Sequence, residues 1–281
     1  MAVRDGALRA IGDLHVEHAE NRELVAAIEP RSERDWLIVC GDVADDPDNV
    51  AWALRLLRSR FAEVIWVPGN HELLAQRDAP QAMRGERRYR HLVELCRGLG
   101  VLTPEDPYPI WDGPGGPVRV VPLFLLYDYS FGRNGFTRAQ ALQRAYDAGV
   151  VCIDEFLLDP APYPSREAWC AARVVEAEGR LRDVEPLLPS ILVNHYPLLP
   201  EPTRMLRHPE FAQWCGTTRT AEWHRRFRAT AVVYGHLHIP RTSWHDGVRF
   251  EEVSLGYPRE RRRWPGYPHQ PRQILPEERR A

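Results

Sequence analysis

The 281-residue sequence contains no lysine, so all 37 of its formally basic residues are arginines. They are slightly outnumbered by 39 acidic residues, which gives a formal net charge of −2. Proteins that bind nucleic acid generally carry a strong basic excess. Because this excess is missing, we expect no nucleic-acid partner.

Long apolar runs are also missing. No stretch approaches the roughly 20 consecutive apolar residues of a membrane-spanning helix, and residues 1–6 lack the apolar region of a secretory signal peptide. Cysteine is scarce, with five residues and no Cys-x-x-Cys spacing. This pattern favours buried free thiols in a reducing compartment over a disulfide framework. We therefore expect a cytoplasmic protein that does not associate with membranes.

The sequence has the composition of a globular protein, with 44% hydrophobic and 27% charged residues. Its length suits one large domain, or one domain that carries an insertion. Apolar runs predict strands over residues 8–12, 36–40, 64–67, 118–126, 191–193, 231–234 and 248–253. Helical spacing separates many of them, over residues 21–28, 49–61, 84–99 and 211–228. This alternation predicts an α/β sandwich, whose ligands would bind at the carboxyl ends of the strands.

The stretch from residue 127 to 189 is long for a connection between strands. It holds two helical patterns, residues 137–149 and 165–181, on either side of a proline-rich piece. We interpret it as a helical insertion or cap over the site, with ordinary crossover helices as the alternative. After residue 258 the chain is rich in arginine and proline. We therefore expect one domain over residues 1–258 and a tail over residues 259–281 with a mobile end.

Ligand-type side chains follow the predicted strands. His236 and His238 come directly after the run 231–234, and alternation along a strand would place both imidazoles on one face, as half of a metal site. One such pair alone is equally typical of solvent-facing loop histidines, but four upstream motifs have the same form. The candidate residues are Asp13, His15, Asp42, Asn70, His71, His195, His236 and His238.

Mixed carboxylate, amide and imidazole donors suit Mn, Fe or Zn better than Ca or Mg. The donors are too many for one tetrahedral ion and sufficient for two. Two ions about 3.5–4 Å apart can clamp the attacking and the leaving oxygen of a phosphoryl centre. Asp42 lies in the middle of the set and is the natural bridging carboxylate.

As an ensemble, the motifs Asp-x-His, Gly-Asp, Gly-Asn-His-Glu, Asn-His and Gly-His-x-His resemble the calcineurin-like metallophosphoesterase superfamily. The resemblance implies a β-sandwich flanked by helices in αββα order. It implies one ion on Asp13, His15, Asp42 and His238, and a second on Asp42, Asn70, His195 and His236. It also implies that His71 stays off the metals as a general acid or electrostatic stabiliser, and we expect Glu72 to orient it.

Longer stretches of the sequence indicate which phosphoester is the substrate. The stretches that resemble the actinobacterial phosphopantetheinyl hydrolase family are residues 35–39, 124–131, 215–218, 235–242, 246–253 and 256–259, and the similarity runs over nearly the whole chain. This resemblance implies removal of 4′-phosphopantetheine from a serine of holo acyl carrier protein. Carriers of this kind are acidic, so arginines within residues 84–90, 225–228 or 259–263 are candidates to dock one. The alternatives are a small-molecule phosphomonoesterase or phosphodiesterase on the same metals, and a non-catalytic metal-binding scaffold.

Overall fold

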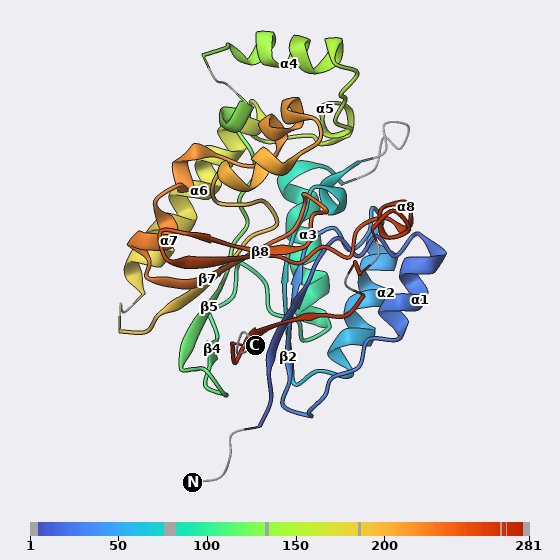
Figure 1. The fold of residues 1–281 in the computed structure, drawn as a ribbon, viewed down its shortest axis with the longest axis vertical. Coiled ribbons are helices and arrows are strands. Elements are labelled where there is room, and N and C mark those ends of the chain that lie inside the picture. The colour runs from blue at the N-terminus through green and yellow to red at the C-terminus, as the bar shows by residue number, and fades with distance from the viewer. Residues whose placement is uncertain are drawn as a thin grey trace.

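Two β-sheets lie face to face at the centre of the molecule, and helices cover the outer face of each (Figure 1). The computed structural model describes residues 5–75, 83–132, 135–184, 187–264, 266–267 and 269–277. This α–β–β–α layering confirms the predicted fold class.

The first sheet has four strands in the order β10-β1-β2-β3. Strands β1, β2 and β3 are parallel, and β10 pairs antiparallel with β1 at one edge. The strands are β1 (Leu8–Ile11), β2 (Trp36–Cys40), β3 (Glu63–Val67) and β10 (Arg272–Leu275).

The second sheet has six strands in the order β4-β5-β6-β7-β9-β8. Its four central strands are parallel, and β4 and β8 are antiparallel edge strands. The strands are β4 (Ile110–Trp111), β5 (Val118–Pro122), β6 (Ser190–Val193), β7 (Ala229–Tyr234), β8 (Arg241–His245) and β9 (Val248–Glu252).

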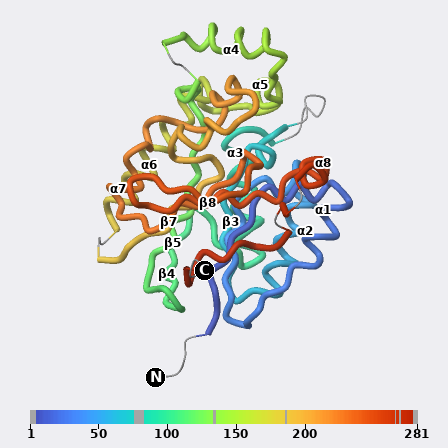
Figure 2. Tube along the Cα trace, in the orientation of Figure 1, coloured from blue at the N-terminus to red at the C-terminus, as the bar shows by residue number. Residues whose placement is uncertain are grey.

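Helices α1 and α2 lie on the side of the first sheet and α6 and α7 on the side of the second, whereas α8, near the end of the chain, returns to the side of α1 (Figure 2). The α-helices are α1 (Ala19–Ala26), α2 (Pro47–Arg58), α3 (Gly85–Gly98), α4 (Arg138–Asp147), α5 (Asp154–Leu157), α6 (Arg166–Asp183), α7 (Trp223–Arg226) and α8 (Pro258–Arg261). Short 3₁₀-helices cover His71–Leu73, Ser130–Gly132, Glu201–Met205, Pro209–Trp214 and Thr218–Thr220. None of the helices in the described ranges is long and apolar enough to cross a membrane.

Burial on both faces explains why the strands read as unbroken apolar runs. In β2, Ile38 and Cys40 belong to the core between the two sheets, whereas Leu37 and Val39 belong to the core shared with the helices. Strand β3 alternates in the same way. All five cysteines are free and buried, as predicted.

Three predicted segments differ from the structure. The strand predicted over residues 118–126 ends at Pro122. The helical pattern over residues 211–228 divides into 3₁₀ turns and the single-turn α7, because Gly216 (φ 144°) interrupts it. The segment after residue 258 is joined to the fold through α8 and β10, and the end predicted to be mobile, residues 278–281, lies outside the described residues.

Residues 127–189 join the neighbouring parallel strands β5 and β6. Within them α6 lies along the outer side of the second sheet, whereas α4 and α5 lie beyond one end of the sandwich (Figure 1). The stretch thus combines a crossover helix with a projecting helical part, and a role of that part as a cap over the site stays a prediction.

Candidate metal centre

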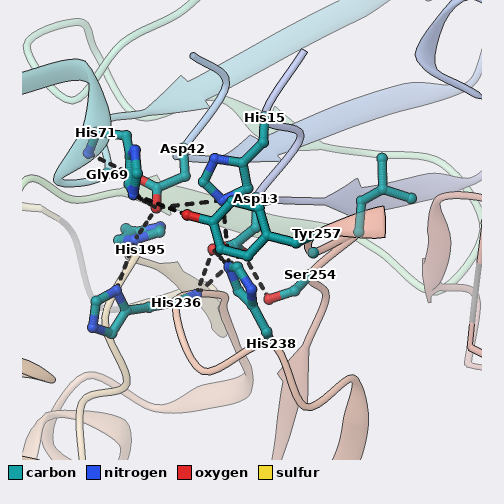
Figure 3. A network of polar contacts seen from close by, with 12 residues as sticks. Asp13, His15, Asp42, Gly69, His71, His195, His236, His238, Ser254 and Tyr257 are labelled. Carbon is teal, nitrogen blue, oxygen red and sulfur yellow. Dashed lines mark hydrogen bonds and ion pairs between the residues drawn. The ribbon is translucent and has the colours of Figure 1, made fainter. Parts of the chain in front are cut away.

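The candidate ligands come from loops at the carboxyl ends of five parallel strands. Strands β1, β2 and β3 of the first sheet lead to one part of the set, and β6 and β7 of the second sheet lead to the rest. Their side chains converge where the two sheets meet (Figure 3). They are Asp13 and His15 after β1, Asp42 after β2, Asn70 and His71 after β3, His195 after β6, and His236 and His238 after β7.

The donor atoms fall into overlapping groups whose members all lie within 4.8 Å of one another. One group is Asp13, His15 and His238, and another is Asp42, His195 and His236. A third joins His15, Asp42 and His71 between them. Asp42 Oδ2 lies 3.4 Å from His195 Nε2 and 4.0 Å from His15 Nε2. Asp42 therefore stands between two donor clusters.

The sequence predicted that His236 and His238 would share one face of a strand, and the structure shows that they do not. Strand β7 ends at Tyr234, and both histidines adopt left-handed backbone conformations with φ of 69° and 53°. Each ring therefore turns to a different donor group, His236 toward His195 and His238 toward Asp13.

Left-handed backbone is concentrated in this set. Asp13, His15 and Asp42 also have positive φ, between 42° and 51°. Such conformations are uncommon for residues other than glycine and cluster at functional sites. Close packing holds them, since a Cβ on Gly69 would lie 2.0 Å from Asp42 Oδ1 and one on Gly235 would lie 2.2 Å from Asp13 Oδ2. The loops are thus shaped around the donor side chains.

A family model for calcineurin-like phosphoesterases matches residues 8–240. This span is more than half of the chain and contains every candidate ligand. The chain belongs to the calcineurin-like phosphoesterase family. Membership makes it a hydrolase of phosphoric esters and implies a metal cofactor.

One relative, matched both in sequence and in crystal structure, extends the comparison of this phosphoesterase over almost its whole length. The [acyl-carrier-protein] phosphodiesterase PptH of Mycobacterium tuberculosis is 53% identical over 271 residues, which are 96% of this chain and 83% of that protein. The crystal structure of the phosphopantetheinyl hydrolase PptH from M. tuberculosis has a TM-score of 0.95 and 52% identity, and the match covers 99% of each chain.

The donor set of the phosphoesterase fits a metal. His15 Nε2 lies 3.4 Å from His238 Nε2, and His195 Nε2 lies 3.2 Å from His236 Nδ1. Ring nitrogens that face each other in pairs, with buried carboxylates beside them, form an arrangement that a shared cation satisfies. Burial alone would raise the pKa of Asp42, but His195, His71 and His15 hold it well below its usual range.

Asn70 is held by a residue that the sequence motifs do not include. Its Nδ2 donates to Asp154 Oδ1 of α5 at 3.0 Å, and its Oδ1 lies 3.3 Å from His195 Nε2. Asp154 is fully buried. Because the carboxylate can only accept from the amide NH₂, it turns the Asn70 oxygen toward the donor groups.

His71 lies at the edge of the donor set. Its Nδ1 is 2.6 Å from Asp45 Oδ1, and its Nε2 is 3.9 Å from Asp42 Oδ2. Burial alone would lower the pKa of His71, but Asp42 and Asp45 raise it to about 10. Asp45 therefore fixes Nδ1 as a donor and directs Nε2 into the centre.

The expectation that Glu72 orients His71 is wrong. The carboxylate of Glu72 accepts hydrogen bonds from the main-chain amides of Asp42, Val43 and Gly69, at 2.9–3.0 Å. Glu72 thus joins the loops that follow β2 and β3, and the carboxylate beside His71 belongs to Asp45.

Further supporting residues come from the segment after β9. Glu260 lies 2.7 Å from His238 Nδ1, and Ser254 Oγ donates to Asp13 Oδ2 at 2.7 Å. The ring of Tyr257 stacks on His15 with 4.3 Å between centroids, and its hydroxyl lies 3.3 Å from His71 Nε2. None of the metal-ligand motifs includes these residues. The string 256–259, similar to the phosphopantetheinyl hydrolase family, was the only available signal for Tyr257.

Proposed function

We propose that this protein hydrolyses the phosphodiester that links 4′-phosphopantetheine to a serine of holo acyl carrier protein. The observation that carries the proposal is the match to PptH, at 53% identity over 96% of the chain and a TM-score of 0.95. PptH is named as an [acyl-carrier-protein] phosphodiesterase. A carrier-protein substrate also suits the cytoplasmic location expected from the sequence.

We infer that the donor groups hold two ions, Mn or Fe, with Zn as the alternative. Asp13, His15, Asp42 and His238 would hold one, and Asp42, Asn70, His195 and His236 the other. The chemistry that such cations supply when bound is Lewis acidity toward the phosphoryl group and the attacking water. Support comes from the overlap of the donor groups at Asp42 and from the paired ring nitrogens.

His71 would act on the leaving oxygen. Water adds to phosphorus and loses a proton to solvent, the bond between phosphorus and the serine oxygen breaks, and His71 Nε2 gives its proton to that oxygen and regains one from solvent. The products are 4′-phosphopantetheine and the serine hydroxyl. The contact between His71 Nδ1 and Asp45 holds the ring for this transfer, and the Tyr257 hydroxyl restrains Nε2 from the other side.

We also propose that the projecting part of residues 127–189 acts as a cap. It contacts the segment that follows His71: Ala75 N donates to Leu157 O at 3.0 Å, and Leu74 forms an isolated antiparallel β-bridge with Leu158. It also supplies Asp154 to Asn70. A cap with these contacts would keep the Asn70 loop in place while substrate enters from the opposite side.

The substrate is tested by intact mass spectrometry of holo acyl carrier protein after incubation with Mn-loaded enzyme. Conversion to the apo mass is the expected result. An unchanged carrier, together with brisk hydrolysis of bis(p-nitrophenyl) phosphate, would refute the carrier substrate and favour a small-molecule phosphoesterase.

The acid role is tested by His71→Ala. We expect kcat on the carrier to fall by about 10²–10⁴-fold, with a smaller fall on the nitrophenyl ester, because nitrophenolate leaves without a proton. Metal content should stay that of the wild type. His91→Ala, an exposed histidine of α3, is the matched control. Equal losses on both substrates would exclude general-acid catalysis by His71.

A further inference from the structure

A hollow of about 480 Å³ lies between the first turn of α1 and α8. Its polar and charged lining consists of His18, Glu20, Tyr257, Arg259 and Arg262. Its volume is within the range of ligand-binding clefts. Arg259 and Arg262 have no role in the reaction proposed for the metal centre.

The hollow and the metal centre share a wall. Tyr257 lines the hollow, and its ring also stacks on His15 with 4.3 Å between centroids. The tyrosine hydroxyl points into the centre toward His71 (Figure 3). His18 meets the Tyr257 ring edge-on from the side of the hollow, at 5.5 Å. A molecule bound in the hollow would therefore be separated from the candidate metal ligand His15 by the Tyr257 side chain alone.

The charges around the centre are unevenly distributed. Arg259 is exposed and lies over the Tyr257 ring at 5.3 Å, and Arg262 is exposed and paired with the equally exposed Glu20. The region beside His71 is acidic, with Glu17 and Asp45 exposed. An acidic partner would be attracted by the α8 side and repelled by the Glu17 side, which would fix its orientation.

The other two arginine clusters have different environments. Arg88 of α3 is buried and donates to main-chain oxygens of Glu72 and Asp45, so it has a structural role. Arg225 and Arg226 of α7 precede the amino end of β7, whereas the metal centre lies beyond its carboxyl end. They therefore lie at the opposite end of this strand from the metal centre. Arg259 and Arg262 are the arginines that line the hollow beside the candidate metal centre.

We propose that the hollow between α1 and α8 docks an acidic face of the carrier protein, through Arg259 and Arg262. The proposal rests on the proposed function. The attacked phosphorus is bonded directly to the serine oxygen, so the carrier surface around that serine must touch the rim of the centre. Tyr257 forms that rim on the α8 side, and the carboxylates of the carrier would replace Glu20 as the partner of Arg262.

The test compares kcat/KM of Mn-loaded enzymes on holo acyl carrier protein and on bis(p-nitrophenyl) phosphate. For Arg259→Glu/Arg262→Glu we expect KM for the carrier to rise roughly 10- to 100-fold. The fold-decrease in kcat/KM on bis(p-nitrophenyl) phosphate should be at least ten times smaller than the fold-decrease on the carrier. Raising the salt concentration should weaken the wild type on the carrier more than it weakens the variant. Arg259→Lys/Arg262→Lys should keep most of the carrier activity, since it retains the charge.

Arg225→Glu/Arg226→Glu is the matched control, because these arginines are also exposed and paired with glutamates, Glu222 and Glu178. It should act on the carrier like the wild type. Equal losses on both substrates in Arg259→Glu/Arg262→Glu would show that the hollow belongs to the catalytic centre and would overturn the docking role. Full carrier activity in that variant would refute the dock alone, whereas a wild type unable to convert the carrier would refute the proposed substrate and the dock together.

Discussion

Asp42 is the residue on which both candidate metal sites depend. Its carboxylate belongs to the group with His195 and His236 and to the group with His15 and His71. Asp42→Ala is therefore expected to lose both ions and all detectable turnover, measured by elemental analysis and by ester hydrolysis. Asp48→Ala, an exposed acidic residue of α2, should retain both. Two ions per chain in Asp42→Ala would contradict the bridging role.

Glu260 orients His238 through its second ring nitrogen. The 2.7 Å contact to Nδ1 directs Nε2 toward Asp13, 3.1 Å away. Loss of such a carboxylate partner typically costs 10- to 100-fold in metal affinity or activity. We expect that loss in Glu260→Ala, from titration of the apoprotein with Mn, and a smaller one in Glu260→Gln, whose amide oxygen still accepts from Nδ1. Wild-type affinity in Glu260→Ala would show that packing alone orients the ring.

The candidate ligands could be predicted because each follows a buried strand within a few residues. Their supporting partners could not, because nothing in the local sequence distinguishes Asp154 or Glu260 from the other acidic residues of the chain. Asp154 is 84 residues from Asn70, and Glu260 is 22 residues from His238. The prediction for Glu72 failed for a related reason, since adjacency to His71 says nothing about the amides of a neighbouring loop.

At the scale of elements, buried strands were predictable and the loops after them were not. Burial on both faces makes β2, β3, β6 and β7 read as continuous apolar runs. The left-handed conformations at His236 and His238 have no such signal, and they assign the two rings to different donor groups. Strand β10 was missed because its pairing with β1 joins residues more than 260 positions apart. The domain limits drawn at residues 1–258 and 259–281 stay a prediction that this pairing disfavours.

Helix α5 links the projecting part of residues 127–189 to the candidate metal centre through a hydrogen bond from Asn70 to Asp154. Asp154→Leu would leave the Asn70 amide free to rotate and present its NH₂ to the metal. We expect one of the two ions to bind about 10- to 100-fold more weakly, measured by Mn titration. Asp154→Asn retains an acceptor and should bind more tightly than the leucine variant. Unchanged binding of both ions in Asp154→Leu would place the restraint on Asn70 elsewhere.

At the scale of the whole molecule, the candidate metal centre lies where the two sheets meet. The first sheet contributes Asp13, His15, Asp42, Asn70 and His71, and the second contributes His195, His236 and His238. A metal that binds donors from both sheets favours the folded state, because the unfolded chain does not hold those donors together. Stability intrinsic to the polypeptide is therefore best measured with the metals removed by a chelator.

One contribution to the stability of the polypeptide itself comes from Glu105, which is not one of the candidate metal donors. Burial alone would raise its pKa, but Arg173, the Tyr89 hydroxyl and Arg90 lower it to about 2, from an ordinary value of 4.5. A lowered pKa in the folded state stabilises the protein fully above about pH 4.5, and the gain is lost as the pH falls toward 2. Arg90 is about half exposed, so solvent screens its part of the interaction, and we expect a contribution of about 1–2 kcal/mol to the free energy of unfolding.

The measurement is urea unfolding of the chelated wild type and Glu105→Gln between pH 6 and pH 2.5. The gap in the free energy of unfolding should stay constant down to about pH 5 and then shrink with falling pH, because protonation of Glu105 makes the wild type resemble the variant. Glu94→Gln alters an exposed pair with Arg97 and should differ from the wild type by less than about 0.5 kcal/mol throughout. A gap for Glu105→Gln that persists unchanged at pH 2.5 would mean that its shape and hydrogen bonds, rather than its charge, support the packing of α3 against α6.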